Sequence, residues 1–210
     1  MTWEDGTLHV VGLQIDPDNS VLTRGLETVR AGRSTRARKI GESLAAAGID
    51  GAYEGAMKYV TSERLVSRTH FARYLVEAGH ARETNDVFKR YLSPGKPGYV
   101  PHAWATLSQA VDQIHAAGGQ AVLAHPGRYK LTRTGMRRLL AEFRDIGGDA
   151  IEVLTSSHTP AQYTEFATYA RVFALRASGG SDWHGPGESW MDFGDLPELP
   201  PGVVPVWKDW

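Results

Sequence analysis

The sequence contains no cysteine among its 210 residues, and it has no long hydrophobic run. The first absence excludes disulfide bonds, thiolate metal ligands and a cysteine nucleophile. The second excludes a membrane-spanning helix, which needs about 20 apolar residues. Residues 1–6 have neither the basic region nor the apolar region of a signal peptide. We therefore expect a soluble, cytoplasmic protein without a membrane partner.

Several catalytic motifs are absent too. There is no Gly-x-Ser-x-Gly elbow, no Walker-type glycine loop, and no Gly-x-Gly-x-x-Gly after a predicted strand. These absences disfavour a nucleophile-elbow hydrolase, a P-loop NTPase and a dinucleotide-binding protein. The formal net charge of −1 indicates no overall attraction to nucleic acid or to membrane surfaces.

The sequence does contain two kinds of periodic pattern. After a short apolar strand at residues 7–13, residues 17–93 carry helical periodicity without a strand signal. The second half instead alternates between predicted strands and helices. Its strands are expected at 120–125, 149–154 and 173–180, with helices at 134–146 and 160–172 between them. Such alternation is typical of a parallel sheet or a β/α barrel.

These patterns predict an α/β fold, with one β/α domain that is interrupted by an all-helical insert. We expect the first barrel strand within 1–16, the insert at 17–97 and the remainder of the β/α domain at 98–210. The β/α part has only three or four units, and a complete barrel needs more strands.

Metal-ligand residue types lie at the ends of the predicted strands. Asp182 and His184 follow the last strand two positions apart, so in extended chain both side chains point to one side. His125 ends another strand, and His9 lies within the first. In β/α folds, functional side chains gather at the carboxyl ends of strands. Three imidazoles and one carboxylate are an ordinary ligand set for Zn²⁺, Mn²⁺ or Fe²⁺.

Each of these residues also has a purely structural interpretation. A single histidine in a strand, such as His9, is more often a hydrogen-bonded residue than a ligand, so the joint arrangement is what favours metal binding. Glu152 ends the strand 149–154 and either faces the cluster or is a satisfied carboxylate at the strand end. His158 has no partner pattern and is interpreted as a surface or structural residue.

Basic residues supply candidates for holding phosphate. Arg128 lies on the loop after a predicted ligand strand, and Lys96 lies where the insert returns to the β/α domain. Arg68 and His70 lie at a predicted helix N-terminus, where amide groups and the helix dipole favour anions. A surface arginine and a flexible linker lysine are the alternatives. The basic run within 24–39 is either a solvated helix face or a rim that attracts phosphate.

Five ordered segments carry a more specific signal. They are 8–13 (LHVVGL), 67–73 (SRTHFAR), 95–100 (GKPGYV), 124–129 (AHPGRY) and 180–184 (GSDWH). Together they resemble the PHP (polymerase and histidinol phosphatase) superfamily. Within it, they are similar to the bacterial nucleoside 3′,5′-bisphosphate phosphatases that also act as 5′→3′ exoribonucleases. The resemblance implies a distorted β/α barrel with a helical insert, and metal-assisted hydrolysis of a phosphoester.

The resemblance also implies roles for single residues. The matching metal ligands are His9, His125, Asp182 and His184, and the last three of these are the candidate catalytic residues. The positions that match substrate-phosphate contacts are Arg68, His70 and Arg128, beside which Lys96 is a further candidate. The implied cofactor is a cluster of two or three Mn²⁺, Fe or Zn²⁺ ions. The implied substrate is a nucleotide or a short RNA.

The sequence departs from the family at its start. Family members begin with His-x-His, Thr-Asp-His-Asp and Glu segments that this sequence does not contain. We therefore expect a barrel that is incomplete at its N-terminus, with fewer or weaker metal ions and an exposed edge that favours self-association. Two alternative functions remain. One is an impaired fragment that binds phosphorylated ligands or a partner chain, and the other is a histidinol-phosphate-type phosphatase.

Overall fold

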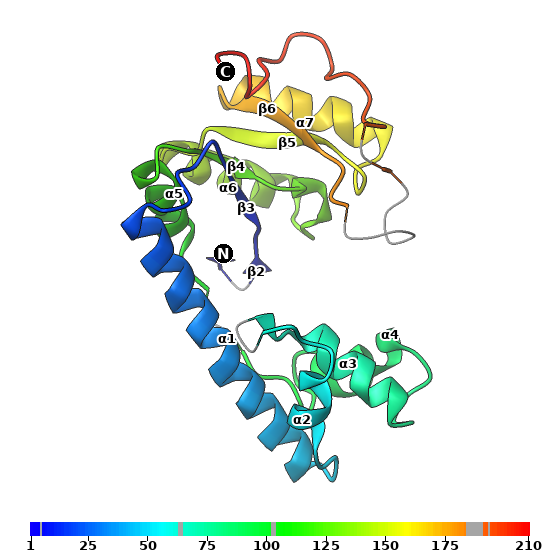
Figure 1. The fold of residues 1–210 in the computed structure, drawn as a ribbon. Coiled ribbons are helices and arrows are strands. Elements are labelled where there is room, and N and C mark those ends of the chain that lie inside the picture. Colours follow the sequence, from blue (N-terminus) through cyan, green and yellow to red (C-terminus); the bar gives the residue numbers. More distant parts are fainter. Residues whose placement is uncertain (5, 63–64, 102–103, 184–190, 193) are drawn as a thin grey trace. The chain divides into compact units, whose positions relative to one another are not determined.

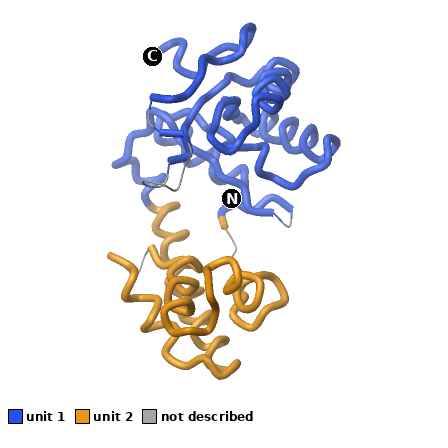
Figure 2. The backbone as a smooth tube through the Cα atoms, turned by 90° about the vertical axis from the view of Figure 1, so that its right-hand side faces the viewer, with its two compact units in different colours: residues 1–23, 105–210 blue, residues 24–104 orange. Residues whose placement is uncertain are grey.

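The structure is a computed structural model. It describes residues 1–4, 6–62, 65–101, 104–183, 191–192 and 194–210. The chain divides into two compact units, which Figure 2 shows in different colours. The sheet unit contains residues 1–23 and 105–210, and the helical unit contains residues 24–104.

The sheet unit is built on four strands (Figure 1). They are β3 (Val10–Leu13), β4 (Gln120–Leu123), β5 (Ala150–Thr155) and β6 (Arg176–Gly180), and they lie side by side in that order. Strands β4, β5 and β6 are parallel, as the alternating pattern predicts, whereas β3 runs antiparallel to β4. A short antiparallel hairpin precedes them, formed by β1 (Thr2–Trp3) and β2 (Gly6–Thr7).

The predicted barrel is not closed by the strands that the structure describes. The four-stranded sheet is open, with β3 and β6 at its edges, so the observed fold is a mixed α/β fold. The β6 edge is covered near the chain end, where Ala177 exchanges backbone hydrogen bonds with Val204 and Val206. The β3 edge includes Val11, which is 39% exposed. Pairing with a second copy along this edge stays a prediction.

Three helices pack against one face of the sheet. They are α5 (Leu107–Ala116), α6 (Arg133–Asp145) and α7 (Pro160–Val172). Because successive strand residues point to opposite faces, Leu123, Ile151 and Val153 share one buried core with these helices. The opposite face carries Val122 and Ala150 in a separate small cluster. Burial of each large apolar side chain stabilises the unit by about 1.5–3 kcal/mol.

The same three helices begin at threonine caps. The side chains of Thr106, Thr132 and Thr159 each accept a hydrogen bond from a backbone N–H three residues later. Thr106 and Gln109 form a capping box, in which the side chain of each residue accepts a hydrogen bond from the backbone amide of the other. Such caps satisfy amide groups that have no partner inside the helix, and they fix where each helix starts.

The helical unit contains no strand among its described residues. Its elements are α1 (Ser20–Ala46, which begins in the sheet unit), α2 (Ala52–Met57), α3 (Arg68–Glu77), α4 (Thr84–Val87) and a π-helical turn, η2 (Phe88–Leu92). Residues 84–92 continue the helical pattern of the unit, but they change from α to π geometry at Phe88. The core of this unit includes Phe71, Leu75 and Leu92. None of the helices that the structure describes is long and apolar enough to cross a membrane.

Candidate functional site

Two candidate ligands meet at one end of the β3–β4 pair. The antiparallel register pairs Val10 with Leu123, so His9 at the start of β3 lies beside the residues that follow β4. The Ala124 amide donates to the His9 carbonyl oxygen at 3.0 Å, which extends the ladder by one step. His125 Nε2 then lies 3.0 Å from His9 Nδ1, with the two rings edge to face.

Tyr129 joins these two histidine-bearing segments. Its hydroxyl donates a hydrogen bond to the Ala124 carbonyl oxygen at 2.7 Å and accepts one from the His9 amide at 2.9 Å. Its ring lies edge to face with that of His125, 5.7 Å away between centroids. The partly buried phenol of Tyr129 therefore fixes the spacing of the segments that carry the two imidazoles, and desolvation raises its pKa above the ordinary value.

His125 is buried and held in an uncommon conformation. It is 4% exposed, and its φ of 31° lies in the left-handed region, where residues other than glycine are strained. Burial, together with the nearby His9, lowers the pKa of His125 to about 4. The imidazole is therefore neutral at pH 7, which is the form that binds metal. Its buried Nδ1 has no hydrogen-bond partner among the described residues.

Glu152 faces the same cluster from the neighbouring strand β5. One of its carboxylate oxygens accepts a hydrogen bond from the His125 amide at 2.6 Å. Burial raises the pKa of Glu152 to about 7, and the hydrogen bond from the His125 backbone opposes that rise. The sequence left two interpretations of Glu152 open, a residue facing the cluster or a satisfied carboxylate at the strand end. In the structure its carboxylate both faces the cluster and is hydrogen-bonded.

Asp182 lies just beyond the end of β6, and it also has a left-handed backbone, with a φ of 49°. Arg128 Nη1 donates to its carboxylate at 3.0 Å, with the arginine side chain 52% exposed and that of the aspartate 21% exposed. The loop after β4 and the loop after β6 thus meet through this ion pair. His184, the predicted ligand two positions later, lies outside the described residues.

A buried histidine supports the loop that carries Arg128. His158 is 2% exposed and stacks on Phe166. Its Nδ1 lies 3.1 Å from the Val153 carbonyl oxygen, so this nitrogen carries the proton and Nε2 accepts the Gly127 amide hydrogen bond at 2.8 Å. Burial lowers the pKa of His158, which keeps it in this neutral form. A Cβ at Gly127 would lie 2.7 Å from the His158 ring, so this position requires glycine.

The donors gathered here fit a divalent cation. Leaving the buried His125 nitrogen without a partner costs about 1–3 kcal/mol, and a neutral imidazole nitrogen is a donor that divalent cations accept. Within the part of the chain that is described, no group of three His, Asp or Glu side chains is arranged to hold an ion. The assignment of His9, His125, Asp182 and His184 as metal ligands therefore stays a prediction.

Known proteins share this sequence over nearly its whole length, although no family model matches it. The chain is 48% identical over 209 residues to the 3′,5′-nucleoside bisphosphate phosphatase of Chromobacterium violaceum, and the match covers 100% of this chain and 73% of that protein. It is 47% identical over 208 residues to the 5′-3′ exoribonuclease Rnm of Salmonella typhimurium, covering 99% of this chain and 70% of that protein. The chain belongs to the PHP-type phosphoesterases. The resemblance inferred from the five sequence segments is confirmed, and the family is one of hydrolytic enzymes.

Solved structures of similar proteins agree with a PHP-type fold. A Chromobacterium violaceum protein, described as an amidohydrolase with bound sulfate and no metal, has a TM-score of 0.88 at 48% identity, covering 99% of this chain and 72% of its own. A Bifidobacterium adolescentis protein described as a putative metal-dependent phosphoesterase has a TM-score of 0.74 at 25% identity. The match covers 99% of this chain and 71% of that protein.

Three predicted phosphate-binding residues of this PHP-type chain lie in the helical unit. Arg68 opens α3, and its Nη1 donates to the Leu92 carbonyl oxygen at 3.2 Å. His70 uses Nδ1 to accept the Ser67 amide hydrogen bond at 3.0 Å, so part of its hydrogen-bonding capacity caps the helix. Lys96 is exposed. Their contact with substrate stays a prediction.

Sequence reasoning did not assign a functional role to Tyr129, Glu152 or His158. Tyr129 lies within the 124–129 segment that matches the family, so its position was available as a signal. The contacts of the other two are made through long-range packing. Only the fold shows that Glu152 meets the His125 amide and that His158 meets the Gly127 amide.

Proposed function

We propose that this phosphoesterase removes the 3′-phosphate of nucleoside 3′,5′-bisphosphates and releases nucleotides from the 5′ end of RNA, using divalent metal ions. The activities named for its relatives support this substrate class. The observation that carries the proposal is the convergence of a neutral, partly unsatisfied His125 with His9 on one side and the loop bearing Arg128 on the other. Such a site combines metal ligands with a cation for phosphate.

The residues that would hold the metal are His9, His125 and Asp182, with His184 added from the following segment. Mn²⁺, Fe and Zn²⁺ all accept this mixture of imidazole and carboxylate ligands. Bound divalent cations supply Lewis-acid stabilisation of phosphoryl oxygens and activation of water. Two contacts keep His125 in place. Tyr129 donates to the carbonyl oxygen of the preceding residue, Ala124, and Glu152 accepts a hydrogen bond from the His125 amide.

Arg128 is the substrate-binding residue at this site. Its guanidinium contacts Asp182 through one nitrogen and remains half exposed, so its other N–H donors are available to a phosphate. The family resemblance implies that Arg68 and His70 also bind substrate phosphate, and Lys96 is a further candidate. A bisphosphate nucleotide supplies two phosphate groups, whereas histidinol phosphate supplies one.

The test compares hydrolysis of adenosine 3′,5′-bisphosphate and of histidinol phosphate in the presence of Mn²⁺. We expect turnover of the bisphosphate, and a decrease in kcat/KM of at least about 100-fold for Asp182→Asn. The matched control is Asp145→Asn, which makes the same change on an exposed aspartate at the end of α6. Preference for histidinol phosphate would contradict the proposal, as would binding of the bisphosphate without any hydrolysis.

A further inference from the structure

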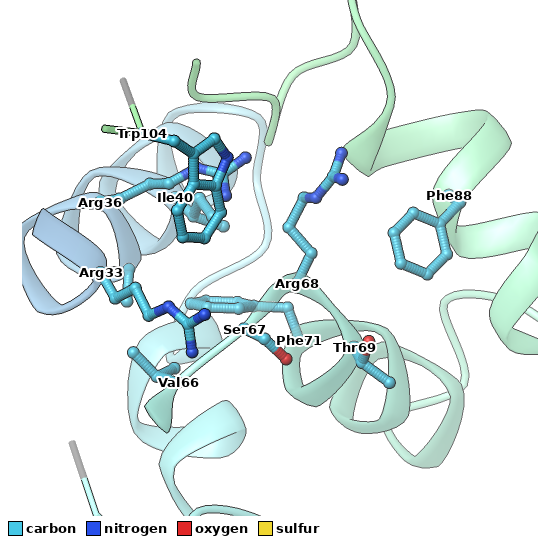
Figure 3. A pocket seen from close by; sticks show the side chains of 11 residues that line it. Arg33, Arg36, Ile40, Val66, Ser67, Arg68, Thr69, Phe71, Phe88 and Trp104 are labelled. Atoms are coloured by element: carbon cyan, nitrogen blue, oxygen red, sulfur yellow. The ribbon is translucent and has the colours of Figure 1, made fainter. Parts of the chain in front are cut away.

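The helical unit contains its own pocket, separate from the cluster of histidines. It has a volume of about 210 Å³ and lies where α1 meets the first turn of α3. Figure 3 shows Arg33 and Arg36 extending from α1 and Arg68 from the start of α3. Trp104 and Phe88 supply the aromatic walls. All of these residues belong to one compact unit, so the pocket does not depend on the position of the sheet unit.

Three guanidinium groups, those of Arg33, Arg36 and Arg68, share this small space. The described residues that line the pocket include no carboxylate. Arg36 Nε donates to the Val100 carbonyl oxygen at 2.7 Å, and Arg68 Nη1 donates to the Leu92 carbonyl oxygen at 3.2 Å. These bonds fix both guanidinium groups, and each group keeps further N–H donors for a ligand. Burial and the positive charge of Arg68 lower the pKa of Arg36. Bringing like charges together is unfavourable unless an anion binds between them.

The aromatic rings hold these cations in place. The Arg33 guanidinium carbon lies 5.1 Å from the centroid of the Trp104 ring, and that of Arg68 lies 5.6 Å from the Phe88 ring. Guanidinium groups and aromatic faces are also the two surfaces on which unpaired bases stack. The pocket therefore offers donors for a phosphate beside a flat apolar surface for a base.

The cationic surface continues beyond the pocket along α1. Arg30 is exposed and lies one turn before Arg33, which lies one turn before Arg36, so the three arginines follow one another along the helix. A single phosphate does not use so many cations, whereas the backbone of a nucleic-acid strand has phosphates at regular intervals. The cavity is also smaller than the roughly 300–1,000 Å³ of sites that enclose a whole small molecule.

We infer that the Arg33–Arg36–Trp104 surface of the helical unit binds single-stranded RNA, with a backbone phosphate on the guanidiniums and a base against the indole. The inference deepens the proposed function and rests on it for the choice of nucleic acid as ligand. Arg33, Arg36 and Trp104 are not among the predicted phosphate contacts. In this inference they bind nucleotides of the RNA other than the one that is hydrolysed. The part of the basic run that carries Arg30, Arg33 and Arg36 is then a phosphate-binding surface, whereas Arg38, which does not line the pocket, lies outside it.

The experiment measures binding without hydrolysis. A 5′-phosphorylated, 3′-fluorescein-labelled oligoribonucleotide of five residues is titrated in EDTA and followed by fluorescence anisotropy, and adenosine 3′,5′-bisphosphate is titrated as competitor. For the double variant Arg33→Gln/Arg36→Gln we expect oligonucleotide affinity to fall at least about 10-fold. The slope of log affinity against log salt should decrease by about 0.7 for each phosphate that the variant no longer binds. Trp104→Ala should weaken oligonucleotide binding about 10-fold because the base has no indole on which to stack.

The matched control is Arg38→Gln. Arg38 is on the same helix and also lies over an aromatic ring, that of Tyr53 at 5.0 Å, but it does not line this pocket. We expect the control to bind the oligonucleotide as the unmodified protein does. Arg33→Gln alone is the second variant, because Arg33 lies against Trp104 and its replacement leaves the Arg36 hydrogen bond intact. Circular dichroism melting checks that each variant is folded.

Two results would overturn the inference. One is oligonucleotide affinity in the double variant equal to that of Arg38→Gln. The other is an equal loss of affinity for the oligonucleotide and for the bisphosphate, which would make the pocket a mononucleotide site. Loss of hydrolysis has no influence on either result, because EDTA removes the metal. A failure of the proposed function is therefore seen in the turnover assay alone.

Discussion

The two units of this chain place opposite kinds of charge in their sites. In the sheet unit, imidazoles and carboxylates gather at strand ends, and backbone amides and carbonyls hold them there. In the helical unit, guanidiniums gather against aromatic rings, with no carboxylate among the described lining residues. The first set suits a cation and the second suits an anion. From this difference we expect metal binding by the sheet unit and RNA binding by the helical unit to be separate properties, each of which a substitution can remove without the other.

The strongest test of this separation uses the two hydrophobic cores. Phe143 and Phe71 are both fully buried, the first in the sheet unit and the second in the helical unit. Replacing either by alanine leaves a cavity and should cost about 3–5 kcal/mol of stability. Hydrogen exchange should show reduced protection within 24–104 for Phe71→Ala and within the sheet unit for Phe143→Ala. An equal reduction in both units would mean that they unfold as one.

The next test removes a predicted metal ligand. His125→Ala deletes the buried imidazole whose Nδ1 lacks a partner among the described residues, and Mn²⁺ affinity at pH 7.5 should fall at least about 100-fold, or about 2.7 kcal/mol. Isothermal titration calorimetry measures this change. His115→Ala is the control, because His115 is exposed and pairs with Asp149 away from the cluster. Oligonucleotide binding in EDTA should remain unchanged in both variants, and a parallel loss would break the proposed separation.

A smaller effect concerns the pH dependence of the sheet unit. The native pKa of Glu152 is about 7 against an ordinary 4.5, so between these values the folded protein keeps a proton that the unfolded chain releases. Stability from this group is therefore lost as pH rises from about 4.5 to 7. Glu152→Gln should leave stability similar at pH 4 and raise it, relative to the unmodified protein, by about 2 kcal/mol at pH 8.

Urea denaturation of Glu152→Gln and of the unmodified protein at both pH values measures this difference. Subtracting one curve from the other removes the opposite contribution of His125, whose pKa near 4 makes stability rise with pH up to about 6.5. A difference between the two proteins that does not change with pH would show that Glu152 is ionised in the folded state.

The smallest expected effect is at a helix cap. Thr106 Oγ1 accepts the Gln109 amide at 3.2 Å, so Thr106→Ala should lower stability by about 1 kcal/mol. Thermal denaturation measures the loss. Thr28→Ala is the control, since Thr28 lies inside α1 and is exposed. A control as destabilised as Thr106→Ala would indicate that the capping bond contributes nothing.

Local patterns were enough to predict most elements of the sheet unit. The alternation of strands and helices after residue 105, and the Thr106 cap, depend on residues close in sequence. The antiparallel direction of β3 depends on contacts across more than 100 residues, which no local pattern contains. The change to a π-helical turn at Phe88 also had no signal in the periodicity, because α and π geometry bury similar positions.

The site was predicted to a different extent. Strand ends made His9, His125 and Asp182 candidate ligands because β/α folds gather such residues at one edge, and that assignment stays a prediction. The groups that hold them were not found, since Tyr129 reaches His9 across 120 positions and Glu152 reaches His125 across 27. The pocket of the helical unit was visible only as a basic run, because its aromatic walls come from Phe88 and Trp104, far along the chain.

The left-handed backbone at His125 and Asp182 has a consequence for protein engineering. Glycine adopts this conformation without the strain that other residues bear there, so His125→Gly and Asp182→Gly each relieve local strain of about 1–3 kcal/mol. Both substitutions also delete a predicted ligand, and at His125 the loss of a buried side chain opposes the relief of strain. Selection for heat resistance alone would therefore favour glycine at Asp182 more than at His125, whereas selection on turnover would keep both residues.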